Sequence, residues 1–175
     1  SISQISQESL NHLIILLGSG YWCFAPTTGS IVLRTEEITM QAMLLAAGFG
    51  TRLRPYTLVR PKPLFPICNI PLLHILLDKL VDAGCDRIVV NCHYLADQIK
   101  EAVERRPEVI LQYEKEVLGT GGGLRKALEH FQDGPDAPVL VMNGDIFHDI
   151  DLAHLIAKHA TAKNAVTMAL HHYPR

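Results

Sequence analysis

Residues 42–55 read AMLLAAGFGTRLRP, and this stretch decides which class of fold the chain adopts. Its first part, Ala42–Ala46, is a continuous apolar run that ends at Gly48, a pattern typical of a strand buried on both faces. The following sequence, up to Pro66, is rich in Gly, Pro and Arg and is predicted to be a structured loop. The stretch therefore indicates a buried strand that leads directly into a glycine-containing loop.

Strand-like and helix-like segments alternate after this loop. Helical apolar spacing and short apolar runs predict, in order, a helix over Leu72–Ala83, a strand over Arg87–Cys92, a helix over Leu95–Arg106, a strand over Val109–Tyr113, a helix over Gly123–Phe131, a strand over Val139–Met142, a helix over Leu152–His159 and a strand over Ala165–Leu170. This alternation predicts an α/β fold, with a mainly parallel sheet and helices on both faces. Ligands of such sheets bind at the carboxyl ends of the strands, so the loops that begin at Gly48, Cys92, Glu114 and Asn143 are the informative ones.

Residues 1–39 show no sustained periodicity and are interpreted as an irregular leader of uncertain origin, ahead of a folded domain over residues 40–175. Ser9–Leu17 is compatible with a short helix and Ile31–Leu33 with a short strand. The chain begins at Ser1, and a sequence that resembles a natural start occurs at Met40, which suggests a fragment or an imperfect gene model with a foreign-looking leader.

Composition argues against several classes of function. The formal net charge is -2 and no dense Lys/Arg run occurs, which argues against a nucleic-acid-binding protein. No stretch approaches the roughly 18 apolar residues of a membrane span, so no membrane partner is expected. The cysteines form no C-x-x-C pair, which favours reduced thiols in a cytoplasmic protein: Cys23, Cys68, Cys85 and Cys92.

The first loop, Gly48–Arg52, suits a phosphate group. Glycines let the backbone approach a phosphate closely, and free N–H groups then bind it. The loop matches neither G-x-x-x-x-G-K-[ST] nor G-x-G-x-x-G, so its glycines alone are a weak signal. Arg52, two residues after Gly50, strengthens it, because a permanently charged, fork-shaped donor suits a triphosphate.

The second loop, RPKPLFP over residues 60–66, presents Lys62 between prolines that restrict the backbone. A charged amine on a rigid support suits a phosphate oxygen. The alternative is a solvated loop lysine beside prolines that only terminate structure. This segment by itself leaves both interpretations open.

These segments together resemble the signature of the sugar-1-phosphate nucleotidyltransferases. The matching segments, in the family's order and spacing, are LLAAGFGTRL (44–53), Pro55, PKPL (61–64), LGTGG (118–122) and NGD (143–145). The resemblance covers about Met40–Leu170. It implies the nucleotidyltransferase fold, a Rossmann-like α/β architecture of which residues 40–175 form the N-terminal nucleotide-binding part. It also implies transfer of NMP from an NTP to a sugar 1-phosphate, with release of pyrophosphate.

The resemblance further implies the roles of individual residues. Arg52 would stabilise charge as pyrophosphate leaves, and Lys62 would contact a phosphate. The nucleotide would be bound by Ala46, Ala47, Gly48, Gly50, Thr51, Glu114, Gly119 and Thr120. Among these, Glu114, Gly119 and Thr120 would read the edge of the base. A solvated acid at the end of a strand is the alternative interpretation of Glu114.

Asp145 resembles the family's metal-binding aspartate. It follows a buried strand, and Mg²⁺ prefers oxygen ligands, often one or two carboxylates together with substrate phosphates. The alternative is a simple turn aspartate in Asn-Gly-Asp. Asp151 lies past the motif and is predicted to be the N-cap of the next helix.

The sequence leaves the substrates open. The TGGG run at 120–123 is similar to the N-acetylmuramate-1-phosphate uridylyltransferase and mannose-1-phosphate guanylyltransferase branches, so UTP and GTP are both expected as candidates. The family's second metal-binding aspartate and its sugar-phosphate lysine come later than Arg175, which predicts weak nucleotide binding and little turnover by this chain. Whether the protein forms a homo-oligomer is also left open.

Two other classes of protein share parts of this pattern. A non-catalytic nucleotide-binding or regulatory subunit with the same fold is the first, and joint retention of Arg52, Lys62 and Asp145 argues against it. A dinucleotide-binding dehydrogenase is the second. It would need a third glycine and an acid at the end of the second strand, where this sequence has Asn91-Cys92-His93.

Overall fold

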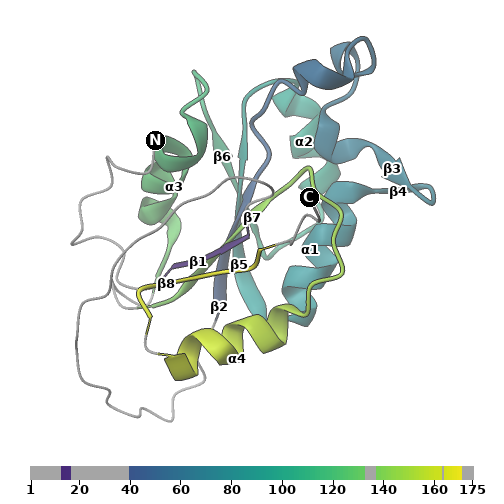
Figure 1. The fold of residues 1–175 in the computed structure, drawn as a ribbon. Coiled ribbons are helices and arrows are strands. Elements are labelled where there is room, and N and C mark those ends of the chain that lie inside the picture. Colours follow the sequence, from purple (N-terminus) through teal and green to yellow (C-terminus); the bar gives the residue numbers. More distant parts are fainter. Residues whose placement is uncertain (1–12, 17–39, 133–136, 163, 171–175) are drawn as a thin grey trace, which may run out of the picture.

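The structure is a computed structural model that describes residues 13–16, 40–132, 137–162 and 164–170. Within these ranges, a six-stranded sheet has the order β6-β5-β2-β7-β1-β8 (Figure 1). Every strand pair in this sheet is parallel. The strands are β1 (Leu13–Leu16), β2 (Met40–Leu45), β5 (Cys85–Cys92), β6 (Val109–Tyr113), β7 (Val139–Asn143) and β8 (Val166–Met168). The predicted mainly parallel sheet is confirmed.

Strand β2 is the centre of the sheet because its side chains are apolar on both faces. Leu44 lies beside Val90 of β5 on one side and beside Met142 of β7 on the other. Met43 and Leu44, which point to opposite faces, are both fully buried. The chain runs outward from β2 through β5 to β6, and then returns to the other side of β2 as β7. This reversal creates a switch point, where parallel sheets usually bind ligands.

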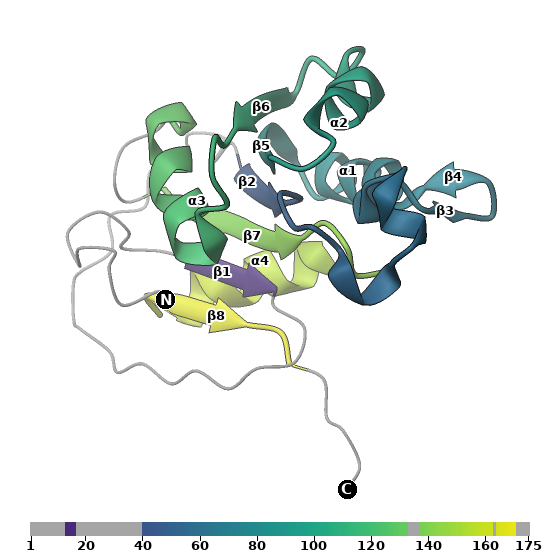
Figure 2. The same cartoon turned by 90° about the horizontal axis from the view of Figure 1, so that it is seen from above.

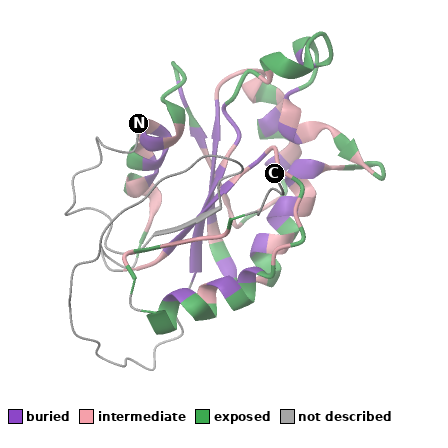
Figure 3. Cartoon of the chain, viewed as in Figure 1, coloured by how far each residue is buried: buried purple, intermediate pink, exposed green. Residues whose placement is uncertain are grey.

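Helices cover both faces of the sheet, as predicted (Figure 2). Helices α1 (Leu72–Asp82), α2 (Ala96–Val103) and α4 (Leu152–Ala162) pack on one face, in a core that includes Leu44. Helix α3 (Gly119–Ala127) packs on the other face, in a second core that includes Met43. Figure 3 shows the buried strands between helices whose outer surfaces are exposed.

Helix α3 begins four residues earlier than the sequence indicates. The prediction placed its start at Gly123, whereas the helix begins at Gly119, which has a left-handed φ of 69°. Glycine is a poor helix former, so a glycine run is normally interpreted as a loop. Here Gly121 and Gly123 are buried. Close packing against the sheet therefore overrides the local propensity.

The segment Leu13–Leu16 corrects the interpretation of the leader at those residues. It forms strand β1, which pairs with β7 and β8, where the sequence allowed a short helix and otherwise an irregular leader. A four-residue apolar run is too short to distinguish helix from strand by periodicity, and the neighbouring strands decide. The strand expected over Ile31–Leu33 and the remaining residues of the leader lie outside the described residues.

The predicted N-cap of α4 is present in the structure. Asp151 caps α4 by accepting a hydrogen bond from the backbone N–H of His154 at 2.9 Å. Cys68, Cys85 and Cys92 are free thiols, and burial raises the pKa of Cys85 to about 12 and of Cys92 to about 11.

A short antiparallel hairpin, β3 (Pro66–Ile67) and β4 (Ile70–Pro71), precedes α1. None of the helices in the described ranges has the length and apolar character needed to cross a membrane.

We expect Leu76→Ala to lower the free energy of unfolding by about 2–5 kcal/mol, because Leu76 of α1 is fully buried against the sheet and the substitution leaves a cavity. Val81→Ala, on the exposed side of the same helix, is the control and should change it by less than about 1 kcal/mol. Urea unfolding measures both. Equal losses in the two variants would contradict the packing of α1 described above.

Candidate functional site

A cavity of about 230 Å³ lies at the carboxyl ends of β2, β5, β6 and β7. This position includes the switch point between β2 and β7. The cavity brings together most of the residues that the sequence singled out: Ala46, Ala47, Gly48, Gly50, Lys62, Glu114, Gly119, Thr120 and Asp145. Leu45, Pro63, Asn91, Val117 and Asn143 also line it.

Gly50 gives the first loop its shape. Its φ of 60° lies in the left-handed region, and it precedes the 3-10 turn Thr51–Leu53. The Thr57 hydroxyl donates a hydrogen bond to the Gly50 carbonyl at 2.9 Å. A Cβ atom at position 50 would lie 2.8 Å from Cγ2 of Thr57. Both the backbone conformation and the contact with Thr57 therefore require glycine here.

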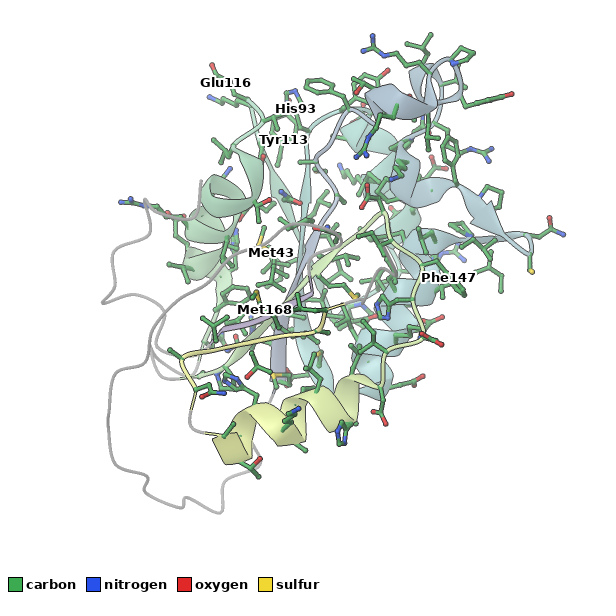
Figure 4. The ribbon with its side chains drawn as sticks, viewed as in Figure 1. Met43, His93, Tyr113, Glu116, Phe147 and Met168 are labelled. Carbon is green, nitrogen blue, oxygen red and sulfur yellow. The ribbon has the colours of Figure 1, made fainter. Side chains whose placement is uncertain are left out.

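Aromatic contacts hold this loop against the end of β5. The Phe49 ring meets the His93 ring edge-on at 5.4 Å between centroids, and lies 5.6 Å from the Tyr94 ring. Nδ1 of His93 lies 2.8 Å from the backbone carbonyl of Glu114, so this nitrogen carries the proton. Figure 4 shows His93 and Tyr113 at the same end of the sheet, well above Met43 in its core. The loops after β2, β5 and β6 are thus joined at one edge.

Lys62 and Asp145 form an ion pair across the cavity. The Lys62 ammonium donates to Oδ2 of Asp145 at 2.7 Å. The side chains are 27% and 35% exposed, so the pair is reachable from solvent. Buried Pro61 and Pro63 fix the backbone on either side of Lys62. The alternative of a freely solvated loop lysine is therefore wrong.

Gly144 brings Asp145 to this position. The Gly144 N–H donates to the Leu45 carbonyl at 2.8 Å, which continues the pairing of β7 with β2 past the last strand residue. A Cβ at position 144 would lie 2.9 Å from that same carbonyl oxygen. Only glycine allows this close approach, and it places Asp145 beside the end of β2.

Two predicted residues, Thr51 and Arg52, do not line the cavity. Both are exposed and belong to the 3-10 turn that follows Gly50. Arg52 makes no ion pair with any residue in the described part of the chain. Its guanidinium is therefore available to a group outside the cavity, and its catalytic role stays a prediction.

Glu114 is buried at 1% exposure, so its interpretation as a solvated acid is wrong. Its Oε1 accepts a hydrogen bond from Nδ2 of Asn91 at 2.8 Å, and its Oε2 accepts one from the Leu118 N–H at 3.1 Å. Oδ1 of Asn91 accepts one from the Ala46 N–H at 2.7 Å. Asn91 is not among the site residues predicted from the sequence. The available signal was one amide at the end of the apolar run Ile88–Val90, directly before a predicted ligand-binding loop.

The carboxylate oxygens of Asp145 suit a hard cation, provided that a bound phosphate supplies further oxygen ligands. One oxygen of Asp145 is paired with Lys62, and Asp145 lines the same cavity as Gly48 and Gly50 of the first loop. The described residues contain no cluster of three or more His, Cys, Asp or Glu side chains that would hold a metal without such help. A single carboxylate fits Mg²⁺, which commonly takes one or two carboxylates together with substrate phosphates.

Comparisons with known proteins agree with this geometry. Residues 41–175 match the Nucleotidyl transferase family. The mannose-1-phosphate guanylyltransferase catalytic subunit beta of Drosophila pseudoobscura pseudoobscura is 39% identical over 124 residues, which are 68% of this chain and 33% of that protein. The same subunit of Xenopus tropicalis is 34% identical over 69% of this chain and 34% of that protein. The chain therefore spans about a third of the length of these relatives.

Solved structures share the fold. HddC from Yersinia pseudotuberculosis, complexed with GMP-PN, superposes with a TM-score of 0.59 and 32% identity, covering 68% of this chain and 53% of that one. A UDP-glucose pyrophosphorylase complexed with UDP-glucose superposes with a TM-score of 0.56 over 71% of this chain and 54% of that one. Its identity is 21%, so this second likeness concerns the fold alone.

His148, in the loop after Asp145, provides a test of this region by pH. Burial, and secondarily Lys79, lower the pKa of His148 below its ordinary value of 6.5, while Asp149 opposes the shift. Its Nδ1 accepts a hydrogen bond from the Ile150 N–H at 3.3 Å, which requires that nitrogen to be unprotonated. The unfolded chain therefore binds the proton more tightly than the folded chain does.

We expect the free energy of unfolding to fall as the pH drops through 6.5, the ordinary pKa, and to level off below the lowered pKa of the folded state. His148→Gln should reduce this dependence, and His154→Gln, at an exposed position of α4, should leave it unchanged. Urea unfolding between about pH 8 and about pH 5 measures it. An identical pH dependence in all three proteins would contradict the neutral state of the half-buried His148.

Proposed function

Because the chain belongs to the nucleotidyl transferase family, we propose that it is the nucleotide-binding part of an enzyme that transfers NMP from an NTP to a sugar 1-phosphate and releases pyrophosphate. One observation carries the proposal. The Lys62–Asp145 pair faces a left-handed glycine loop in a cavity at the switch point of a parallel sheet. A cavity of this kind can surround one bound phosphate chain with backbone N–H groups, the Lys62 ammonium and the Asp145 carboxylate.

Different residues of the chain have different roles in such a reaction. A phosphate oxygen of the sugar phosphate attacks the α-phosphorus in line with the departing pyrophosphate, and this chemistry needs positioning and charge neutralisation more than a covalent residue. Gly48 and Gly50 admit the triphosphate close to the backbone. Lys62 offsets negative charge in the cavity, and exposed Arg52 does so where pyrophosphate leaves. Ala46 and Ala47 lie against the nucleoside, and the loop at Gly119 and Thr120 meets the base.

Asp145 would hold Mg²⁺ together with the phosphates, and the ion would neutralise phosphate charge there. Lys62 donates a hydrogen bond to this same carboxylate. When a triphosphate enters, the ammonium gains a second, more highly charged partner. The pair thus keeps both groups ordered at the position that the phosphates occupy.

Among nucleotides, we propose GTP, with mannose 1-phosphate as the sugar substrate. The supporting observations are the likeness to two mannose-1-phosphate guanylyltransferase subunits and to a solved relative complexed with GMP-PN. UTP is the competing candidate from the sequence. A cytoplasmic location and a homo-oligomeric state stay predictions.

The test is calorimetric titration with GTP, UTP, dTTP, CTP and ATP, with and without Mg²⁺. We expect selective binding of GTP that Mg²⁺ strengthens. Asp145→Asn should abolish the strengthening by Mg²⁺, because the carboxylate is lost. Without Mg²⁺, the same variant should bind GTP as well as or better than the unaltered chain, because a negative charge near the triphosphate is removed and Lys62 is released.

Asp149→Asn is the matched control, since Asp149 is an exposed acid four residues further along that does not line the cavity. It should leave both titrations unchanged. Binding of every NTP with equal affinity, or an equal loss in the two variants, would contradict the proposed site. No nucleotide binding by a folded chain would favour a subunit that kept the fold without the activity.

Gly48→Ala tests whether the phosphates approach the backbone of the first loop. Apart from Gly48 and its two chain neighbours, no heavy atom of the described residues lies within 4 Å of a Cβ built there, and φ is outside the left-handed region, so the fold should tolerate the methyl group. We expect the thermal midpoint to change little and the Kd for GTP with Mg²⁺ to rise about tenfold, because the methyl occupies phosphate space. Unchanged affinity would place the phosphates elsewhere.

A further inference from the structure

Thr57 is buried in a short turn whose apolar residues are exposed. The turn is the 3-10 element Tyr56–Leu58, which follows the first loop. Tyr56 and Leu58 are 71% and 53% exposed, whereas Thr57 is 1% exposed. Apolar side chains normally take the buried positions of a protein, so this reversal indicates that the threonine faces inward for a specific contact.

That contact is with Gly50, which Thr57 meets with both branches of its side chain. The hydroxyl donates a hydrogen bond to the Gly50 carbonyl at 2.9 Å. The methyl group lies against the same residue, since a Cβ built at position 50 would be 2.8 Å from Cγ2 of Thr57 and 3.4 Å from Cβ of Lys62. Gly50 is therefore packed between Thr57 and Lys62.

The hydrogen bond turns the Gly50 carbonyl away from the cavity. Gly50 lines the cavity, whereas Thr57 is buried and does not line it. The Leu53 N–H is a second donor to this carbonyl, at 2.9 Å. In a planar trans peptide the C=O and N–H groups point in opposite directions, so the Thr51 N–H points away from Thr57. A phosphate in the cavity therefore does not meet the negative end of this peptide.

Glycine makes this orientation easy to lose. Gly50 has a φ of 60°, and glycine occupies both positive and negative φ readily, so the backbone on either side of it can turn without a steric cost. The hydrogen bond from Leu53 closes within the loop itself. Thr57 belongs to the next turn, which is tied to α2, because the Gln98 side chain donates to the Val59 carbonyl at 2.9 Å. Thr57 thus connects the Gly50 carbonyl to the rest of the domain.

We propose that Thr57 is a positioning residue for the first loop, whose hydroxyl keeps the Gly50 carbonyl turned away from the bound phosphates. The inference rests on the proposed nucleotide-binding function and deepens it. Thr57 acts on nucleotide affinity through Gly50, without touching the nucleotide.

The test separates the two branches of the side chain. Thr57→Val keeps the shape that packs against Gly50 and removes the hydroxyl. Its Kd for GTP in the presence of Mg²⁺ should rise by about fivefold, the effect of one hydrogen bond. Thr57→Ser keeps the hydroxyl and removes the methyl group, and its Kd should stay within about twofold of the unaltered chain. Calorimetric titration measures both.

Each variant loses one buried group, so a purely structural role would weaken binding in both. An equal rise of Kd in Thr57→Val and Thr57→Ser would therefore overturn the inference. A Kd of Thr57→Val within about twofold of the unaltered chain would overturn it as well, because the hydroxyl would then have no effect on the phosphates.

Thr167→Val is the matched control. Thr167 lies in β8, at the edge of the sheet, and does not line the cavity. Its Oγ1 is 2.9 Å from Nδ1 of His159, so the variant removes a hydroxyl hydrogen bond of the same length by the same substitution. It should leave the Kd for GTP unchanged. If it raises the Kd as much as Thr57→Val does, the effect is general destabilisation and the inference is wrong.

Amide hydrogen exchange at Leu53 supplies a readout without nucleotide, because the Leu53 N–H donates to the same Gly50 carbonyl. Exchange should speed up in Thr57→Val and stay unchanged in Thr57→Ser and Thr167→Val. Unchanged exchange in Thr57→Val would contradict the positioning role.

The two proposals fail separately. If the unaltered chain binds no NTP, the proposed function fails, whereas exchange at Leu53 still decides whether Thr57 orders the first loop. If the unaltered chain binds GTP and Thr57→Val binds it equally well, the function stands and the positioning role of Thr57 fails.

Discussion

Burial of β2 between two parallel neighbours, β5 and β7, determines where the other strands and the cavity lie. Because both faces of this strand are apolar, it occupies the centre of the sheet, with β5 and β7 beside it. Its carboxyl end therefore emerges between two other strand ends. The loop after β2 therefore lies beside the polar residues at the ends of β5 and β7. The cavity forms where the ends of β2, β5, β6 and β7 meet.

The polar groups at this edge are held by backbone more than by long side chains. Gly144 donates a hydrogen bond to the Leu45 carbonyl, which places Asp145 beside the end of β2. Gly50 turns the first loop toward Lys62. Each glycine sits where a Cβ would collide or where φ is positive. Fixed placement of side chains by the backbone suits reactions that depend on positioning, because the groups are ordered before the ligand binds.

Charge in the cavity is balanced in two different ways. Lys62 and Asp145 form a partly exposed ion pair, which solvent and ligands can reach. Glu114 is buried and is satisfied by hydrogen bonds from Asn91, Gln112 and Leu118 without a cationic partner. A carboxylate held in this way adds rigidity to the loops around it, because releasing any donor would leave a buried charge less well bonded.

The parallel α/β class, most element positions and most of the residues that line the cavity could be predicted from the amino-acid sequence. The reason is that a buried central strand has a continuous apolar pattern, and that glycines, prolines and charged residues mark the loops that follow strands. The remaining features come from the tertiary structure. It made Leu13–Leu16 a strand, started α3 within its glycine run, buried Glu114 and joined it to Asn91. These outcomes depend on contacts between segments far apart in the chain, and local propensity contains no information about such neighbours.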